Sequence, residues 1–342
     1  VFFLRSVFII SLTGPIIFYF CLKQKFKRCD NLLLILVSSI LFLSPYFRTS
    51  SYWGLEENFA IISLLLTFLF FDKFLSNYDE RKNKYLLFLT IFFSSLCLYF
   101  DPKFIIIPLI CFFQIIFSSK SSKLKNFSVF LYFIFSLPYI YLILIWGNII
   151  PSQDAGLRGI GDKVYLAHLG YASTIISFYL FPLLFFKKKG LFILFRNFFK
   201  TKKNIYFLSL FFIYLLYLLI FYDYDSESKL GKGIVHKTAI LFFEENYLQK
   251  IYTFFSFFIS WLILLVYLNN NLKDKLIIIY FFLLSIIGWP ILQEYFDPLI
   301  MLMAFTFFGS KLFINYKNSI FLFMYLSILL IFSNIYYYNL IN

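Results

Sequence analysis

Two adjacent carboxylates at the start of an apolar run are the first candidates for chemistry. Glu56 and Glu57 follow a polar stretch that contains Arg48, and the apolar run starts directly after them. A carboxylate here could bind a sugar or a divalent metal, and the Arg48 guanidinium could hold a phosphate. A divalent metal is compatible with these carboxylates, but no ligand cluster indicates one. Simple capping is the alternative, because a helix N-terminus attracts negative charge.

A second candidate is the short polar turn Asp101, Pro102 and Lys103 between two apolar runs. Proline breaks a helix because its backbone nitrogen has no hydrogen to donate. Pro102 therefore enforces a break between the two runs, and the Lys103 ammonium next to it could contact a phosphate at the membrane surface. A tight turn without a further role is the alternative for this segment.

The longest candidate is the glycine-rich connector 146–170, which carries Arg158, Asp162, Lys163 and His168. Glycines let backbone amides approach an anion, and the basic side chains complement its charge. The nucleotide-binding pattern G-x-x-x-x-G-K-[ST] is not present in this stretch. The composition favours a substrate-binding loop in which Asp162 is a candidate catalytic carboxylate.

Two later connectors carry weaker signals. In the connector 223–250, an exposed His236 beside Lys237 could act as a phosphate ligand, and residues 240–245 could form a short amphipathic helix in the membrane interface. The proline-bracketed turn 289–298 holds Glu294 and Asp297. Acids so close to a bilayer are costly unless they are paired or hydrated, which favours a substrate-binding role for Glu294. Plain interfacial loops are the alternative in both places.

The elements that must position these residues are membrane-spanning helices. Of the 342 residues, 61% are hydrophobic and only 14% are charged, which excludes a soluble enzyme. We expect an all-α polytopic bundle in which residues 1–342 form a single integral membrane domain. A spanning helix needs roughly 20 mainly apolar residues. About twelve such runs are predicted, at 1–22, 31–47, 58–75, 85–100, 104–117, 127–150, 171–186, 205–222, 251–268, 276–292, 299–313 and 319–340.

The connectors between these runs alternate in charge. One set, exemplified by 187–203, holds most of the lysines and arginines, whereas the other set holds most of the acids. Because Lys and Arg accumulate in cytoplasmic loops, the first set is predicted to face the cytoplasm and all the candidates above to face outward. The net charge of +14 is explained by orientation and contact with lipid headgroups, so no nucleic-acid partner is expected. The membrane would be the bacterial inner membrane or the endoplasmic reticulum.

Several motifs resemble the GT-C superfamily of polytopic glycosyltransferases, and in particular the dolichyl-phosphate-glucose α-1,2-glucosyltransferase family. The carriers of this resemblance are the Glu56–Glu57 pair, the Asp101–Lys103 turn, WGNII (146–150) followed by GDK (161–163) and His168, and LQEYFDP (292–298). The family's Arg-Gln-Thr-Asn motif is replaced here by DPKF (101–104).

The resemblance implies inverting transfer of a sugar from a polyprenyl-phosphate donor to a glycan or lipid-linked acceptor on the outer face. It also implies that the main catalytic acid lies in a first outer loop, before residue 1, with a first span that this chain lacks. The phosphate-binding candidates are then Arg48, Lys103, Arg158, Lys163 and His168, while His236 and Glu294 are further substrate-binding candidates.

Two other function classes fit the same composition. A transporter or flippase would show inverted repeats and charges in mid-membrane, and the sequence shows no internal repeat. A polysaccharide polymerase or ligase would also act on lipid-linked sugars with large outer loops.

Overall fold

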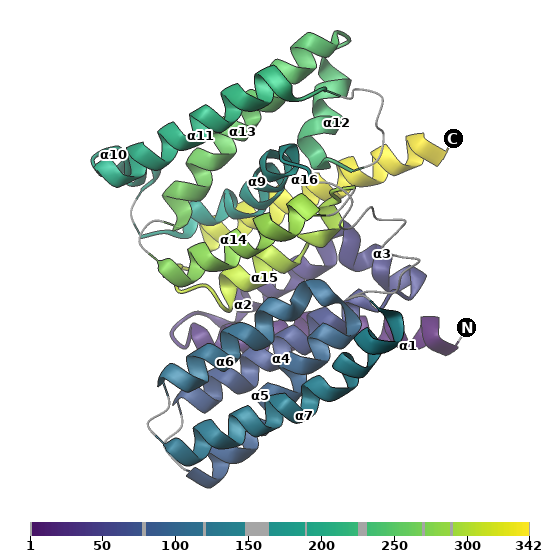
Figure 1. The fold of residues 1–342 in the computed structure, drawn as a ribbon, viewed down its shortest axis with the longest axis vertical. Coiled ribbons are helices and arrows are strands. Elements are labelled where there is room, and N and C mark those ends of the chain that lie inside the picture. The colour runs from purple at the N-terminus through teal and green to yellow at the C-terminus, as the bar shows by residue number, and fades with distance from the viewer. Residues whose placement is uncertain are drawn as a thin grey trace. The chain divides into compact units, whose positions relative to one another are not determined.

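The computed structural model describes residues 2–76, 80–118, 121–147, 164–188, 190–224, 231–268, 271–287 and 290–341. Within these ranges the secondary structure is entirely helical, as the sequence predicts (Figure 1). The chain divides into two compact units, which are described separately below. Unit 1 comprises residues 1–154 and 323–342, and unit 2 comprises residues 155–322.

Unit 1 is a bundle built around two long antiparallel helices, α4 and α5, which lie side by side (Figure 1). Helix α1 packs against α4, while α6 and α7 pack against α5. Leu22, Leu65 and Leu87 are fully buried in this core. The helices are α1 (Phe2–Lys25), α2 (Asn31–Ser38), η1 (Ser39–Leu43), α3 (Pro45–Trp53), α4 (Glu57–Ser76), α5 (Glu80–Phe100), η2 (Pro102–Ile105), α6 (Ile106–Ser118) and α7 (Ser122–Trp146).

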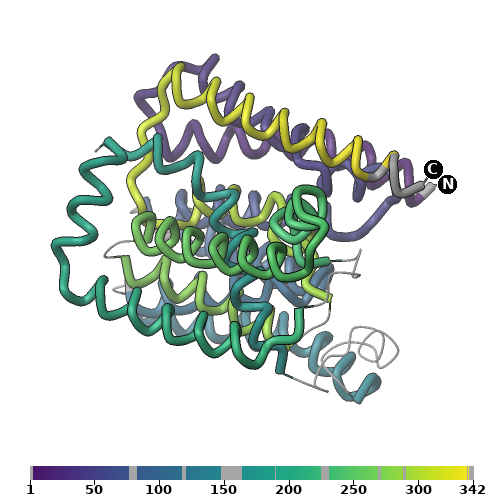
Figure 2. The backbone as a smooth tube through the Cα atoms, turned by 90° about the horizontal axis from the view of Figure 1, so that it is seen from above, coloured from purple at the N-terminus to yellow at the C-terminus, as the bar shows by residue number. Residues whose placement is uncertain are grey.

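Unit 2 is built around α9, which packs against α12, α13, α14 and α15. Helix α11 runs beside α13 on the outside of this unit (Figures 1 and 2). The elements are α9 (Ala167–Leu180), η3 (Pro182–Phe186), α10 (Leu191–Phe199), α11 (Lys202–Phe221), α12 (Gly233–Phe242), α13 (Asn246–Leu268), α14 (Leu272–Ile287), η4 (Gln293–Tyr295), α15 (Leu299–Phe305) and the start of α16 (Tyr316–Ile341).

Burial separates the central helix of unit 2 from its lipid-facing helix. In the most apolar 18 residues of Ala167–Phe186, 78% of the residues are buried within the protein, whereas the corresponding share for Lys202–Phe221 is only 11%. Close approach at α9 depends on Gly170, because a Cβ there would lie 2.2 Å from Cε2 of Phe257 in α13. Exposed apolar side chains on α11 suit contact with lipid tails, so the low burial of this helix fits a membrane protein.

Eight helices in the described ranges are long and apolar enough to span a membrane, or nine if the bent pair 31–53 counts as one span. The protein is therefore a multi-pass membrane protein, but the expected count of about twelve spans is not confirmed. The difference arises at four predicted runs. Residues 31–53 bend by 62° between Asn31–Leu43 and Pro45–Trp53. Helices α6, α14 and α15 have only 13, 16 and 7 residues, fewer than a full span needs.

Within each unit, the connectors rich in lysine and arginine lie together at one end, and connectors of the other set lie at the opposite end. In unit 1 the Gln24 amide donates a hydrogen bond to Asp72 at 2.5 Å, which joins the basic ends of α1 and α4. In unit 2 the Phe313 N–H donates to the Phe186 carbonyl at 2.7 Å at the basic end, and the Lys232 N–H donates to Ile291 at 2.7 Å at the other. This grouping agrees with the alternation read from the charges.

Candidate functional site

The first cluster of candidate residues lies at the end of unit 1 where α3, α4 and η2 begin or end. Helix α3 starts at Pro45, and the Ser44 hydroxyl accepts a hydrogen bond from the Phe47 N–H at 3.0 Å, which caps the helix. It ends at Gly54, whose φ of 70° is a left-handed conformation that favours glycine. A Cβ on Gly54 would also lie 2.5 Å from Cδ2 of Leu4. The conformation at Gly54 therefore fixes the direction in which the chain enters α4.

Glu57 is the first residue of α4, and one oxygen of its carboxylate accepts a hydrogen bond from the Ser50 hydroxyl at 3.2 Å. The next residue, Asn58, is buried, and its amide nitrogen lies 2.9 Å from the Ser11 hydroxyl and 3.0 Å from the Phe47 carbonyl. These contacts tie the start of α4 to α1 and α3. The carboxylate of Glu57 is therefore half-buried and oriented, whereas that of Glu56 is exposed.

Asp101 and Lys103 form an ion pair across the break between α5 and η2. The Lys103 ammonium lies 2.8 Å from one Asp101 oxygen, and the other oxygen accepts from the Lys103 N–H at 2.9 Å. Both side chains are mostly buried, with 15% of Lys103 and 18% of Asp101 exposed. The contact with the backbone N–H caps η2, so the expected turn at Pro102 is confirmed. The ion pair holds the Lys103 ammonium in place.

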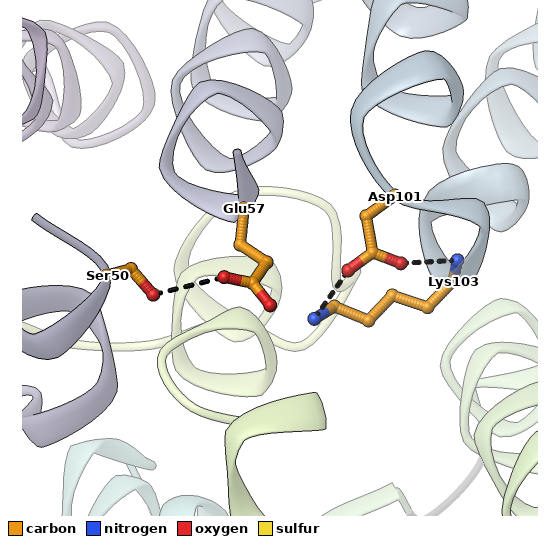
Figure 3. A network of polar contacts seen from close by, with 4 residues as sticks. All are labelled: Ser50, Glu57, Asp101 and Lys103. Carbon is orange, nitrogen blue, oxygen red and sulfur yellow. Dashed lines mark hydrogen bonds and ion pairs between the residues drawn. The ribbon is translucent and has the colours of Figure 1, made fainter. Parts of the chain in front are cut away.

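Glu57 and Lys103 face each other from separate helix ends (Figure 3). The carboxylate of Glu57 extends from the start of α4, and the ammonium of Lys103 extends from η2 toward the same space. A carboxylate beside a cation can accept the proton of a hydroxyl while the cation meets a phosphate. Arg48 lies on the neighbouring helix α3, where it is half-buried.

A second cluster lies at one end of unit 2, around Lys232. Lys232 is 1% exposed and adopts φ of 59°, a left-handed conformation that costs free energy in a residue with a side chain. Its ammonium lies 6.0 Å from the centroid of the Tyr224 ring. Nδ1 of His236 lies 3.0 Å from the hydroxyl of the same tyrosine. A buried lysine, tyrosine and histidine thus share one environment.

The segment around Lys232 also contacts the turn that carries Glu294 and Asp297. Besides the Lys232 hydrogen bond to the Ile291 carbonyl, a Cβ on Gly231 would lie 2.8 Å from that same carbonyl oxygen. In this turn Gln293 donates to the Tyr179 hydroxyl at 3.0 Å and Asp297 is 4% exposed, while Glu294 is half-buried. The structure therefore brings the connector 223–250 into contact with the turn 289–298.

The two histidines do not have the exposure expected of open phosphate ligands. His236 is 1% exposed, so the expectation of an exposed His236 is wrong, because α12 packs on α9 and α13 and covers it. His168 is 2% exposed, stacks on Tyr165 and places Nδ1 3.0 Å from the Ser285 carbonyl, which links α9 to α14. Burial also lowers the pKa of Lys237 below its ordinary value.

The other candidate residues and segments from the sequence lie partly outside the described ranges. Arg158, Asp162 and Lys163 lie outside the described residues. The helix predicted over 240–245 is not present as such, because α12 ends at Phe242, and only residues 240–242 form its exposed apolar end. Lys232 was not singled out as a site residue in the sequence, although Gly-Lys-Gly at 231–233 is a local signal for unusual backbone at a charged residue.

Metal binding finds no support in the parts of the chain that the structure describes. No group of three or more His, Cys, Asp or Glu side chains there could hold a metal ion. None of the four cysteines, all of which lie in the described ranges, forms a disulfide, and Cys21, Cys97 and Cys111 are buried.

The chain was also compared with known proteins. No family model matches it, and neither a curated protein nor a solved structure is significantly similar to it.

Proposed function

We propose that this chain is a membrane glycosyltransferase of the GT-C type, which transfers a sugar from a polyprenyl-phosphate donor to a glycan or lipid-linked acceptor. The observation that carries the proposal is the facing pair of Glu57 and Lys103 at the end of unit 1 that the charge pattern places outside (Figure 3). In a bacterium this end would face away from the cytoplasm at the inner membrane, and in a eukaryote it would face the lumen of the endoplasmic reticulum.

In the proposed reaction, Glu57 accepts the proton of the acceptor hydroxyl as the acceptor oxygen bonds to the anomeric carbon of the sugar. The bond from that carbon to the phosphate oxygen breaks on the opposite face, and the lipid phosphate leaves with the electron pair. Lys103 stabilises the charge that develops on this phosphate. Asp101 keeps the Lys103 ammonium in place, and Ser50 orients the carboxylate of Glu57. Displacement from the opposite face inverts the configuration at the anomeric carbon.

The test is transfer of radiolabelled sugar from polyprenyl-phosphate donors by the purified protein in detergent. We expect a labelled acceptor product, and we expect Glu57→Gln to lower kcat by about 10²–10⁴-fold because general-base catalysis contributes that much. Glu56→Gln is the matched control and should keep kcat within about threefold, because Glu56 is exposed. Equal losses in both variants would contradict the assignment to Glu57.

The same radiolabelled polyprenyl-phosphate donors distinguish a transferase from the other two function classes. A transporter or flippase would move labelled donor across a vesicle membrane without forming a product. A polymerase or ligase would join preassembled lipid-linked glycans instead of transferring one sugar.

A further inference from the structure

An open cavity with a mixed polar and apolar lining lies at the basic end of unit 2, at the opposite end of α13 from the Lys232 cluster. Its volume is about 460 Å³. Three connectors that are far apart in the sequence line it: Lys187 follows η3, Asn271 and Lys273 stand at the start of α14, and Ser310 lies between α15 and α16. The site proposed for sugar transfer uses none of these residues, so the cavity needs its own explanation.

Lys187 is held in the wall of the cavity rather than in open water. Its ammonium lies 4.2 Å from the centroid of the Tyr267 ring, which is fully buried. The Tyr267 hydroxyl accepts a hydrogen bond from Ser310 at 3.1 Å, so the ring has a fixed position. Burial lowers the pKa of Lys187 to about 8, which means that the ammonium has lost part of its hydration. Such a cation gains more from a nearby anion than a fully hydrated one does.

A buried acid that is not part of the lining fixes one wall segment, and the lining itself offers donors that suit an anion. One carboxylate oxygen of the buried Asp274 accepts a hydrogen bond from the Gly309 N–H at 2.9 Å. This hydrogen bond holds residues 309–310 in place. The side-chain oxygen of Asn271 accepts a hydrogen bond from the Lys273 N–H at 3.1 Å. The amide nitrogen of Asn271 therefore points away from that N–H and can donate a hydrogen bond to a ligand. Lys273 and Lys187 supply two positive charges.

The cavity also has an apolar wall, formed by Leu268 and Leu272. It lies beside connectors rich in lysine, at the end of the unit where the charge pattern places the cytoplasmic headgroup layer. A charged head and an apolar wall together suit a phosphate group that carries a hydrocarbon chain, although a small phosphate would satisfy the same donors.

We propose that this cavity binds a phosphate group, supplied either by an anionic phospholipid headgroup or by a soluble phosphate. Lys187 and Lys273 contact the phosphate oxygens, and the amide nitrogen of Asn271 donates a hydrogen bond to them. This inference does not depend on the proposed transferase activity.

The experiment titrates the purified full chain, in an uncharged detergent, with three probes. Dioctanoyl phosphatidic acid tests the lipid source, inorganic phosphate tests the soluble source, and dioctanoylglycerol controls for apolar binding alone. Native mass spectrometry or calorimetry gives each dissociation constant. Binding of phosphatidic acid only supports a lipid headgroup, and binding of inorganic phosphate as well supports a soluble phosphate. Binding of neither probe, or of all three equally, would overturn the proposal.

Variants locate the binding. Lys187→Gln and Lys273→Gln should each weaken phosphate binding by tenfold or more, while Lys187→Arg, which keeps the charge, should restore most of it. Lys188→Gln is the matched control, because Lys188 is the adjacent residue, is exposed and does not line the cavity. A loss that is equal in Lys187→Gln and Lys188→Gln would refute the site.

A measurement on the unaltered chain covers the case in which a variant fails to fold. Bound phosphatidic acid or phosphate should protect Lys187 and Lys273 from acetylation, relative to Lys188, as read by peptide mass mapping. Unchanged acetylation at saturating probe would count against the proposal as firmly as a lack of binding.

Discussion

At the scale of single residues, Lys103 is the cation with the best-defined environment in unit 1. Its ammonium is held by Asp101 and faces Glu57, and in the proposed reaction it meets the phosphate of the donor (Figure 3). We expect Lys103→Gln to raise KM for the polyprenyl-phosphate donor and to lower kcat/KM by about 10–100-fold, since a charge-assisted contact to phosphate is worth about 1.5–3 kcal/mol. Steady-state kinetics with varied donor measures this.

Lys84→Gln is the control for that substitution. Lys84 is exposed at the other end of α5 and carries the same charge. A similar rise in KM in both variants would show that only the overall positive charge matters, and Lys103 would lose its assigned role.

Lys187 makes phosphate binding depend on pH. With a pKa near 8, most of its ammonium groups are charged at pH 7 and most are neutral at pH 9. Tyr267, Lys273 and Asp274 are the ionisable groups around it, and the charge of Asp274 acts to raise the pKa of Lys187. Affinity for phosphatidic acid should therefore fall by several-fold from pH 7 to pH 9. In Lys187→Gln this fall should be clearly smaller, which repeated titrations at the two pH values would establish.

At the scale of elements, the contact of α9 with α13 is a close helix crossing that depends on a glycine. Gly170→Ala would place a methyl group 2.2 Å from Cε2 of Phe257, so one of the two helices must move. We expect a loss of about 1–3 kcal/mol in the free energy of unfolding, as for other overpacked cores, and a lower Tm in detergent. Gly190→Ala should leave Tm within about 1 °C, because nothing lies within 4 Å of a Cβ at Gly190.

The sequence predicts most elements but little of their packing. Hydropathy places the long helices, and proline places the break before Pro102, because both signals are local. The break before Pro45 is missed, since the predicted run 31–47 passes through it. The burial of His168 depends on the carbonyl of Ser285, more than a hundred residues away in the chain. Lys232 and the cavity at Lys187 likewise depend on segments that only the folded chain brings together, so a reading of local charge could not find them.

At the scale of the whole molecule, the sidedness of the membrane helices is the assumption that the transferase proposal needs most. The charge pattern places the connector after α10 in the cytoplasm and the connector before α13 outside. Reporter fusions that end at Thr201 should therefore be active in the cytoplasm, and fusions that end at Glu245 should be active outside. The reverse pattern would put Glu57 and Lys103 on the cytoplasmic side, where the proposed donor site could not operate as described.

The short helix α14 has a consequence for the membrane itself. Its 16 residues rise about 24 Å, compared with the roughly 30 Å thickness of a typical hydrocarbon core. Leu276, Ile279 and Leu283 are exposed along one side of it, where acyl chains would meet them. Although α14 is too short to count among the eight spans, its exposed apolar side needs acyl chains beside it, and a bilayer meets a short apolar segment by local thinning. The protein should therefore be more stable in bilayers of short-chain lipids than in thick ones, so that acyl-chain length becomes a variable that controls its folding.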